Sequence, residues 1–152
     1  MLVGLISDTH SLIRAEALAA LHGADMILHA GDVGAEAVLR ELRGIAPVHA
    51  VYGNVDDPAM GLPQSVELVL DGMAVHVSHG HEVGSPRPEL LVERYPADVI
   101  VYGHTHKPLI ERRGGTLVVN PGAAGPRRFN LQPSIGLLRI ERGVASAEIV
   151  GI

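Results

Sequence analysis

The stretch "DVIVYGHTHKP", residues 98–108, indicates the fold because a buried strand runs directly into two histidines. Residues 99–102 are apolar without polar alternation, which is typical of a strand covered on both faces in a parallel sheet. The chain then passes Gly103 and reaches His104 and His106. Two histidines directly after such a strand suggest a chemical role. The residues at the ends of the other strands indicate which role this is.

Short apolar runs recur along the chain and alternate with helical patterns in its first half. Helical spacing of Ala and Leu predicts helices over residues 13–23 and 35–44, each closing on a glycine. A third helix is predicted within residues 87–96, where it stops before a proline. Strand–helix–strand alternation implies right-handed crossovers and a largely parallel sheet. The apolar runs span residues 2–7, 25–31, 48–53, 73–80 and 98–103.

The middle and the C-terminal part have the alternating pattern of antiparallel hairpins. Asp-Gly at 71–72, Gly-Gly at 114–115 and Arg-Gly at 142–143 each separate two alternating runs, which predicts tight turns. Two sheets packed face to face, with helices outside, accommodate the parallel and the antiparallel parts together. We therefore expect an α/β fold in a single domain over residues 1–152, a length typical of one folded unit.

Composition narrows the classes of function. Hydrophobic residues make up 47% of the chain and aromatic residues only 3%, which favours an aliphatic core and argues against ligand binding by aromatic stacking. The net charge of -5 argues against general binding to nucleic acids or anionic membranes. The absence of cysteine excludes disulfides and thiolate metal sites. Because the N-terminal apolar run is too short for a signal or membrane segment, we expect a soluble cytoplasmic protein.

Polar side chains stand at the ends of five successive apolar runs, where open α/β sheets bind their ligands. Each residue alone has a purely structural interpretation: an aspartate caps a helix, an asparagine suits a turn, and a lone histidine suits a core. Together they favour a divalent-metal centre, because Asp, Asn and His supply the oxygen and nitrogen ligands of such metals. The candidate ligands are Asp8, His10, Asp32, Asn54, His79, His104 and His106.

The ordered motifs "DTH", "GDVG", "GNVD", "HGH" and "GHTH" resemble those of the calcineurin-like metallophosphoesterases. The chain is most similar to their small bacterial and archaeal phosphodiesterase branch. The similarity runs from about residue 3 to about residue 140 and includes the ending "NPGAAGPRRFNLQPSIGLLRI". The resemblance implies a four-layer α/β/β/α sandwich of two mixed sheets, in agreement with the topology expected from the hydrophobic pattern.

The resemblance also implies how the seven ligands divide between two divalent transition-metal ions. One ion would be held by Asp8, His10 and His106, the other by Asn54, His79 and His104, with Asp32 as the bridge. Family sites hold manganese, iron, zinc or nickel, and manganese is the expected metal here. Two such ions lower the pKa of a shared water and clamp the attacking and leaving oxygens of a phosphoester. After two carboxylates and a bridging hydroxide, about one positive charge remains, which complements a phosphodiester monoanion.

The chain departs from the wider family at Val55. Many members have a histidine after the motif's asparagine, where it acts as the general acid, and valine cannot transfer a proton. His81, two residues beyond His79, is the candidate substitute, with a supporting or purely structural role as the alternative. Asp56 is a candidate to orient His10 or a water, with a loop-capping carboxylate as the alternative.

Three residues are candidates for binding the substrate: Asn54, Arg127 and Arg128. Arginines after a glycine-rich turn can hold a phosphate, although solvated surface arginines are the competing interpretation. The expected function is a two-metal phosphodiesterase that attacks a small phosphodiester, such as a nucleotide, with a metal-bridging hydroxide. The alternatives are a phosphomonoesterase, which would need more positive charge near the site, and a non-catalytic scaffold, as in the retromer subunit that resembles this family. The sequence leaves the oligomeric state open, a homodimer included.

Overall fold

The computed structural model describes residues 1–152 and contains two five-stranded sheets. The order of the first sheet is β10 (Val144–Gly151), β9 (Ser134–Glu141), β1 (Leu2–Ile6), β2 (Met26–His29), β3 (Val48–Ala50). The order of the second is β4 (Ser65–Leu70), β5 (Met73–Ser78), β6 (Val99–Val101), β8 (Thr116–Asn120), β7 (Leu109–Arg113). The helices are α1 (Ala15–Leu21), α2 (Glu36–Arg43) and α3 (Pro88–Arg94), with single 3₁₀ turns at Pro58–Met60 and His81–Val83.

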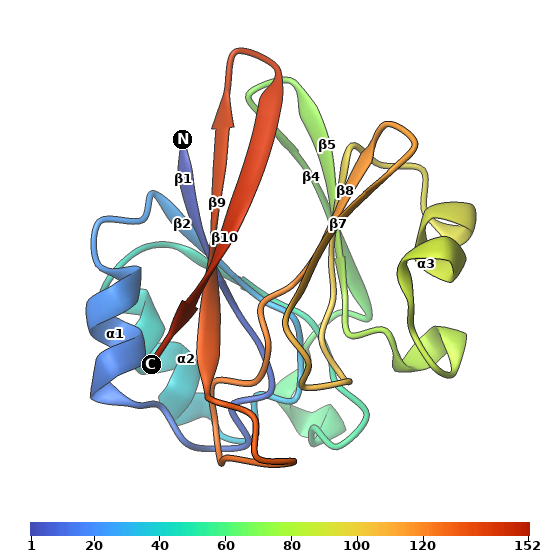
Figure 1. The fold of residues 1–152 in the computed structure, drawn as a ribbon. Helices are drawn as coiled ribbons and strands as arrows, with labels where there is room; N and C mark the ends of the chain where they lie inside the picture. Colours follow the sequence, from blue (N-terminus) through green and yellow to red (C-terminus); the bar gives the residue numbers. More distant parts are fainter.

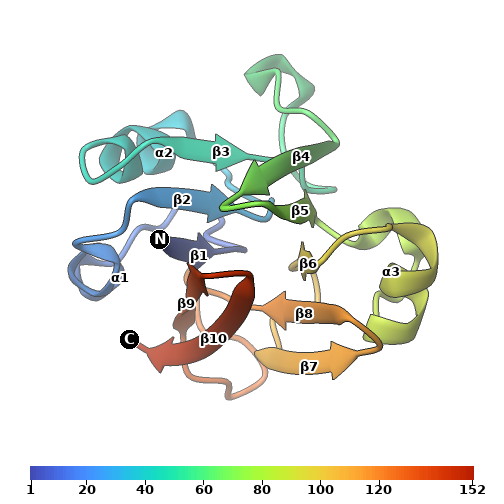
Figure 2. The ribbon, with the colours of Figure 1, turned by 90° about the horizontal axis from the view of Figure 1, so that it is seen from above.

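The two sheets pack face to face and the helices lie outside them (Figure 1). Seen along the layers, α1 and α2 cover the outer face of the first sheet and α3 covers that of the second (Figure 2). Between the sheets, Leu5 and Leu28 belong to the same buried cluster as Val77 and Val101. The predicted four-layer α/β/β/α sandwich of two mixed sheets is confirmed.

The helices form where apolar side chains repeat at helical spacing. In α2, Val38, Leu39 and Leu42 are buried against the first sheet, and burial of each such side chain stabilises the fold by about 1.5–3 kcal/mol. The helix ends at Gly44. The third helix begins at Pro88, whose fixed φ suits the first helical position.

Tight two-residue turns join the antiparallel strands at the end of the molecule opposite the parallel strand ends. Leu70 pairs with Met73 across the first turn, and Asp71 and Gly72 have φ of 47° and 79°. The turn at 142–143 has φ of 51° and 75° at its two residues. Positive φ at both central positions is the type I′ geometry that matches the twist of the strands. The predicted turns are confirmed.

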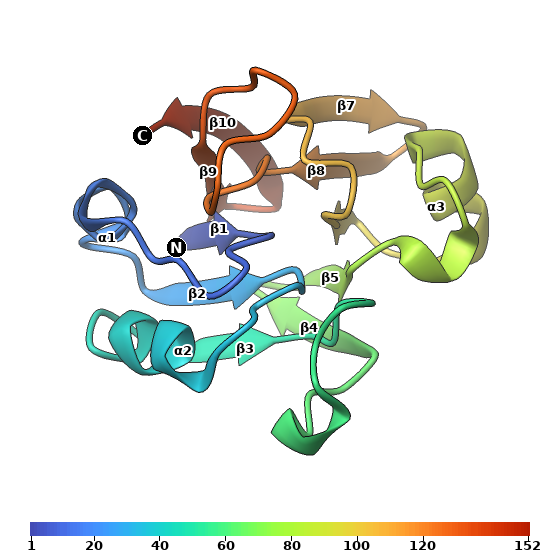
Figure 3. The ribbon, with the colours of Figure 1, turned by 90° about the horizontal axis from the view of Figure 1, so that it is seen from below.

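The parallel strands deliver the candidate ligands to one place. The first three strands of the chain are parallel in the first sheet, and β5, β6 and β8 are parallel in the second. The loops that follow these strands gather at one end of the molecule, seen from below in Figure 3. Strand β6 ends at Val101, so His104 and His106 lie in an irregular loop. No helix has the length and apolarity that a membrane crossing requires.

Candidate metal centre

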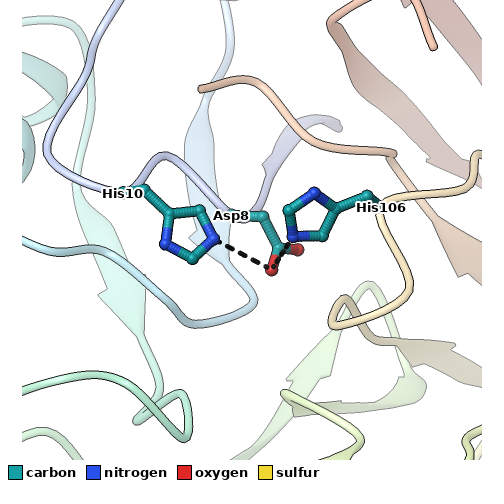
Figure 4. Close-up of side chains that lie close together, drawn as sticks. All are labelled: Asp8, His10 and His106. Atoms are coloured by element: carbon teal, nitrogen blue, oxygen red, sulfur yellow. Dashed lines mark ion pairs between the residues drawn. The ribbon is translucent and has the colours of Figure 1, made fainter. Parts of the chain in front are cut away.

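Asp8 lies at the centre of the first group of candidate ligands and is fully buried. Its Oδ2 accepts hydrogen bonds from Ser7 Oγ at 2.6 Å and from the His104 backbone N–H at 3.1 Å. Its Oδ1 has no hydrogen-bond partner, and it lies 3.3 Å from His106 Nε2 and 3.9 Å from His10 Nε2 (Figure 4). A buried carboxylate oxygen that faces two imidazole nitrogens without a hydrogen bond is typical of a metal site.

His79 anchors the second group of candidate ligands. Its Nδ1 donates a hydrogen bond to the carbonyl oxygen of Ala30 at 2.7 Å, which leaves Nε2 as the ligating nitrogen of the neutral ring. That Nε2 lies 3.2 Å from Asp32 Oδ2 and 3.3 Å from His104 Nδ1. A carbonyl that fixes the tautomer of a histidine in this way is the usual support of a metal ligand.

Asp32 stands between the two groups. Its Oδ2 faces His79 on one side and lies 3.7 Å from His10 Nε2 on the other. Its Oδ1 accepts a hydrogen bond from the Val55 backbone N–H at 3.1 Å, which fixes the carboxylate. The carboxylate that was expected to bridge therefore lies between a histidine of each predicted ion.

The electrostatics of the site favour cations. Burial alone would raise the pKa of Asp32, but hydrogen bonds from His79 and Val55 and the nearby His10 outweigh it and lower the pKa to about 2. Burial lowers the pKa of His10 and also that of His104, where the neighbouring His79 adds to the effect. The carboxylate is therefore ionised at neutral pH, and these two imidazoles keep the lone pairs that metals require.

The pKa of His79 moves the other way. Burial lowers it, but the hydrogen bond to Asp32 and the charges of Asp8 and Asp32 outweigh burial, so the net shift is upward. The same two buried carboxylates that attract a proton to His79 would attract a divalent ion. The donor atoms lie within 4.8 Å of one another in each of two groups: Asp8, His10 and His106, and Asp8, Asp32 and His79. Oxygen and imidazole donors without other partners fit borderline divalent metals.

The backbone approaches these side chains closely. At Gly103 a Cβ atom would lie 2.0 Å from Ser7 Oγ and 2.7 Å from Asp8 Oδ2, so only glycine fits. Five candidate ligands have left-handed φ between 46° and 72°, which costs a non-glycine residue about 1–3 kcal/mol. They are Asp8, His10, Asp32, His104 and His106. Backbone strain concentrated on residues that share a chemical task is characteristic of functional sites.

The family follows from a comparison with known proteins. Residues 1–143 match the model of the calcineurin-like phosphoesterase superfamily domain. The chain belongs to this family. The resemblance inferred from the strand-end motifs is thereby confirmed, and the donors described above all lie within the matched residues.

Curated and solved relatives align with nearly the whole chain. A probable metallophosphoesterase from Methanothermobacter thermautotrophicus is 35% identical over 99% of this chain and 92% of its own length. A phosphodiesterase from Methanocaldococcus jannaschii is 26% identical over 93% of this chain and 95% of its own. The crystal structure of Vps29 in complex with zinc from Entamoeba histolytica superposes with a TM-score of 0.83 and 27% identity, over 99% of both chains.

The remaining candidate residues lie around the donor groups. The ring of His81 is 5.4 Å from that of His79 and 6.4 Å from that of His104, and its Nδ1 is buried without a hydrogen-bond partner. Asn54 is exposed and directly precedes Val55, whose N–H holds Asp32. Their functional roles stay predictions.

Asp56 binds backbone rather than side chains. Its carboxylate accepts hydrogen bonds from the N–H groups of Val33, Gly34 and Gly53, at 2.9–3.2 Å. These bonds tie the loop after β2 to the loop after β3, on both sides of Asp32. No hydrogen bond joins Asp56 to His10. The contacts of Asp56 are those of a carboxylate that caps a loop, which the sequence analysis gave as the alternative.

Arg127 and Arg128 are exposed, and together with His106 they line a hollow formed by the loop between β8 and β9. Arg128 is near enough to the donors to contribute to the lowered pKa of His10. The two arginines therefore lie beside the first donor group, where a phosphate bound to the metals would also lie. Their role in binding substrate stays a prediction.

Sequence reasoning missed residues that hold the ligands in place. Ser7 fixes the orientation of Asp8, and Asn120 donates to the Gly103 carbonyl and to Thr105 Oγ1, both at 3.0 Å. Ser7 adjoins the motif "DTH", and Asn120 is the first residue of the ending "NPGAAGPRRFNLQPSIGLLRI", so these positions were the available signal. Ser7 bonds its neighbour in the chain, whereas the partners of Asn120 lie 17 and 15 residues away on another loop, so the pairing of Asn120 could not be read from the sequence.

Proposed function

We propose that this phosphoesterase hydrolyses phosphodiesters with two bound divalent metal ions. The observation that carries the proposal is the pair of donor groups joined by Asp32, in which Asp8 Oδ1 and His10 Nε2 are buried without hydrogen-bond partners. Unpaired buried polar atoms are costly, and a cation removes that cost. The matching family model and the phosphodiesterase relative support the same activity.

The assignment of ligands follows the predicted division. Asp8, His10 and His106 would hold one ion, Asn54, His79 and His104 the other, and Asp32 both. Manganese is the proposed native metal. When bound, the ions supply an activated water and positive charge on the phosphate oxygens. The chain's own contribution is to orient the ligands before substrate arrives. Ser7 fixes the carboxylate of Asp8, and the Ala30 carbonyl fixes the ring of His79.

The charge around the centre favours a diester over a monoester. A phosphomonoester dianion needs more positive charge than a diester monoanion, and Arg127 and Arg128 are the cationic side chains of the adjacent hollow. Both are exposed, so solvent screens them. A small diester, such as a nucleotide ester, is the proposed substrate.

The leaving group is proposed to receive its proton from His81. Val55 is 59% exposed and carries no group that can donate a proton. His81 is half-buried at the edge of the second donor group, and its ring lies edge-on to Tyr52 at 6.2 Å. Its buried Nδ1 has no hydrogen-bond partner and lies 3.8 Å from Glu82 Oε1. A histidine at the edge of the centre can reach a leaving oxygen on the substrate side.

A non-catalytic scaffold is the second candidate, because the chain shares its fold with Vps29, whose name stands for vacuolar protein sorting 29. Zinc occupies the wild-type Vps29 of Entamoeba histolytica, so bound metal alone does not distinguish the two functions. Hydrolysis does.

The test combines metal analysis with a substrate panel. Protein reconstituted with Mn²⁺ should retain close to two ions per chain and cleave aryl phosphodiesters faster than the matching monoesters. A reconstituted chain that binds two ions and cleaves neither class would be a scaffold. A chain that prefers monoesters would be a phosphomonoesterase, and one that retains no metal would contradict the centre itself.

A further inference from the structure

Phe129 is the single phenylalanine of the chain, and its side chain is 74% exposed. It lies in the loop between β8 and β9, at the end of the molecule that carries the donor groups (Figure 3). Its backbone is left-handed, with φ of 55°, followed by Asn130 with φ of 56°. Asparagine adopts this conformation readily, but an aromatic residue does so rarely. The two residues form the centre of a turn in which the Leu131 N–H donates to the Arg128 carbonyl, so this turn holds a largely exposed aromatic ring on a backbone conformation that aromatic residues rarely adopt.

The ring is not isolated from the chemistry. Its centroid lies 6.2 Å from that of His106, with the two planes at 71°, so Phe129 stands edge-to-face against a candidate metal ligand. On the other side it lines a hollow together with Thr105, Lys107 and Leu131. Lys107 is the single lysine of the chain. The hollow therefore combines an aromatic face, an aliphatic wall and a cation directly beside the proposed metal centre.

The two polar side chains that line this hollow, Thr105 and Lys107, offer hydrogen-bond donors. Thr105 Oγ1 already accepts from the Lys107 backbone N–H at 3.1 Å and from Asn120 Nδ2 at 3.0 Å, so its free function is the hydroxyl proton. The Lys107 ammonium has donors and no acceptor. A ligand that fits must have a flat ring for Phe129 and acceptor atoms on the edge of that ring. Nucleobases have both, as ring nitrogens and carbonyl oxygens.

We propose that Phe129, Lys107 and Thr105 form a nucleobase subsite, so that the substrate is a nucleotide diester whose phosphate lies at the metals. This inference rests on the proposed phosphodiesterase function and narrows its substrate class. The proposal runs against the expectation from the 3% aromatic content, which argues against ligand binding by aromatic stacking. A single ring suffices, because stacking acts one base at a time.

Three diesters with one leaving group test the subsite: the p-nitrophenyl esters of thymidine 5′-phosphate, phenyl phosphate and methyl phosphate, each with Mn²⁺. Phe129→Ala should lower kcat/KM for the thymidine ester about 10-fold and leave the methyl ester within about twofold. Phe129→Trp should restore the thymidine rate. Lys107→Met should slow the thymidine ester alone, because the phenyl ring has no acceptors.

Exposed residues at the opposite end of the molecule provide matched controls. Val144→Ala removes an exposed apolar side chain, and Arg139→Met removes an exposed cation, both on the β9–β10 hairpin. Neither should change any of the three rates. Equal losses on the thymidine and methyl esters in Phe129→Ala would overturn the subsite. If Phe129→Ala lowers kcat/KM for the phenyl ester as much as for the thymidine ester, and Lys107→Met changes neither, the ring stacks on any aryl group. That result would overturn base recognition.

Product binding separates this inference from the proposed function. Calorimetry with thymidine 5′-phosphate should give a Kd about 10-fold weaker for Phe129→Ala than for the native chain. If no diester is hydrolysed by the metal-loaded protein, the proposed function fails, while this measurement still decides the subsite. An unchanged Kd, or no binding to the native chain, would overturn it.

Discussion

The two ends of the molecule both contain left-handed residues, but for different reasons. At the end that carries the two-residue turns (the hairpin end), Asp71 and Gly72 adopt positive φ because such a turn must match the twist of its strands. At the opposite end, which carries the candidate ligands (the metal end), five of the seven have positive φ; of these, His10 lies in the turn that the Leu12 N–H closes on the Thr9 carbonyl, and His104 in the one that the Thr105 N–H closes on the Gly103 carbonyl. There the backbone conformation aims donor atoms at a shared centre. Strain at one end serves topology, and at the other it serves chemistry.

The largest expected difference between the ends concerns activity. Asp32→Ala removes the carboxylate that faces both donor groups, so we expect kcat/KM to fall by roughly 10³-fold or more, beyond the 10–100-fold typical of supporting residues. Asp71→Ala, at the hairpin end, should change it less than about twofold. Steady-state kinetics with an aryl diester, together with metal analysis of both variants, measure the difference. A fully active Asp32→Ala variant would contradict the proposed centre.

The second prediction concerns proton donation at the metal end. His81→Ala should slow diesters with poor leaving groups by about 10²-fold and activated aryl diesters far less, because general acids matter most for basic leaving groups. Val55→His should recover part of that loss if the new imidazole reaches the leaving oxygen. A series of aryl diesters with the native chain and both variants gives the slopes. A flat dependence in the native chain, unchanged in His81→Ala, would show that the proton comes from elsewhere.

The third prediction is an acid sensitivity that originates at the metal end. Burial, which outweighs the nearby carboxylates, lowers the pKa of His29 to about 4. Its Nδ1 accepts the Gly31 N–H and its Nε2 donates to Thr9 Oγ1, so both nitrogens are satisfied only in the neutral ring. In the unfolded chain His29 binds a proton near pH 6.5, whereas in the folded chain it does so only near pH 4. Stability should therefore be complete above pH 6.5 and decline as the pH falls toward 4.

His29 should account for about 2 kcal/mol of lost unfolding free energy between pH 7 and pH 5. Urea unfolding in the presence of EDTA, at both pH values, measures it in the native chain and in His29→Gln. The variant should lose about 2 kcal/mol less than the native chain over this interval. His22→Gln, on an exposed histidine, provides the control and should behave as the native chain does. Identical pH dependence in His29→Gln would refute the assignment.

The smallest effect is expected at the hairpin end. Gly72→Ala places a Cβ on a residue with φ of 79°, where nothing crowds it, so the cost is backbone strain alone, about 1 kcal/mol. Unfolding free energy should fall by that amount while kcat/KM and metal content stay unchanged. A loss of activity in this variant would show that the two ends are coupled.

Local sequence patterns predicted the secondary-structure elements and the candidate ligands of the site. Apolar runs without alternation specified the buried parallel strands, glycine-containing dipeptides specified the tight turns, and polar residues at the strand ends specified the candidate ligands. These signals are local, since periodicity and turn chemistry act within a few residues. The order of motifs then indicated the family, which the family model confirms over residues 1–143.

The tertiary structure was needed to show which loops support one another. The hydrogen bonds from the amides of Val33 and Gly34 to Asp56 and the edge-to-face contact of Phe129 with His106 each join loops that follow different strands. A residue's type does not reveal its partner when that partner lies on another loop, because the distance between them is set by the whole core. For the same reason, aromatic content could not show that one exposed ring stands beside the metal centre.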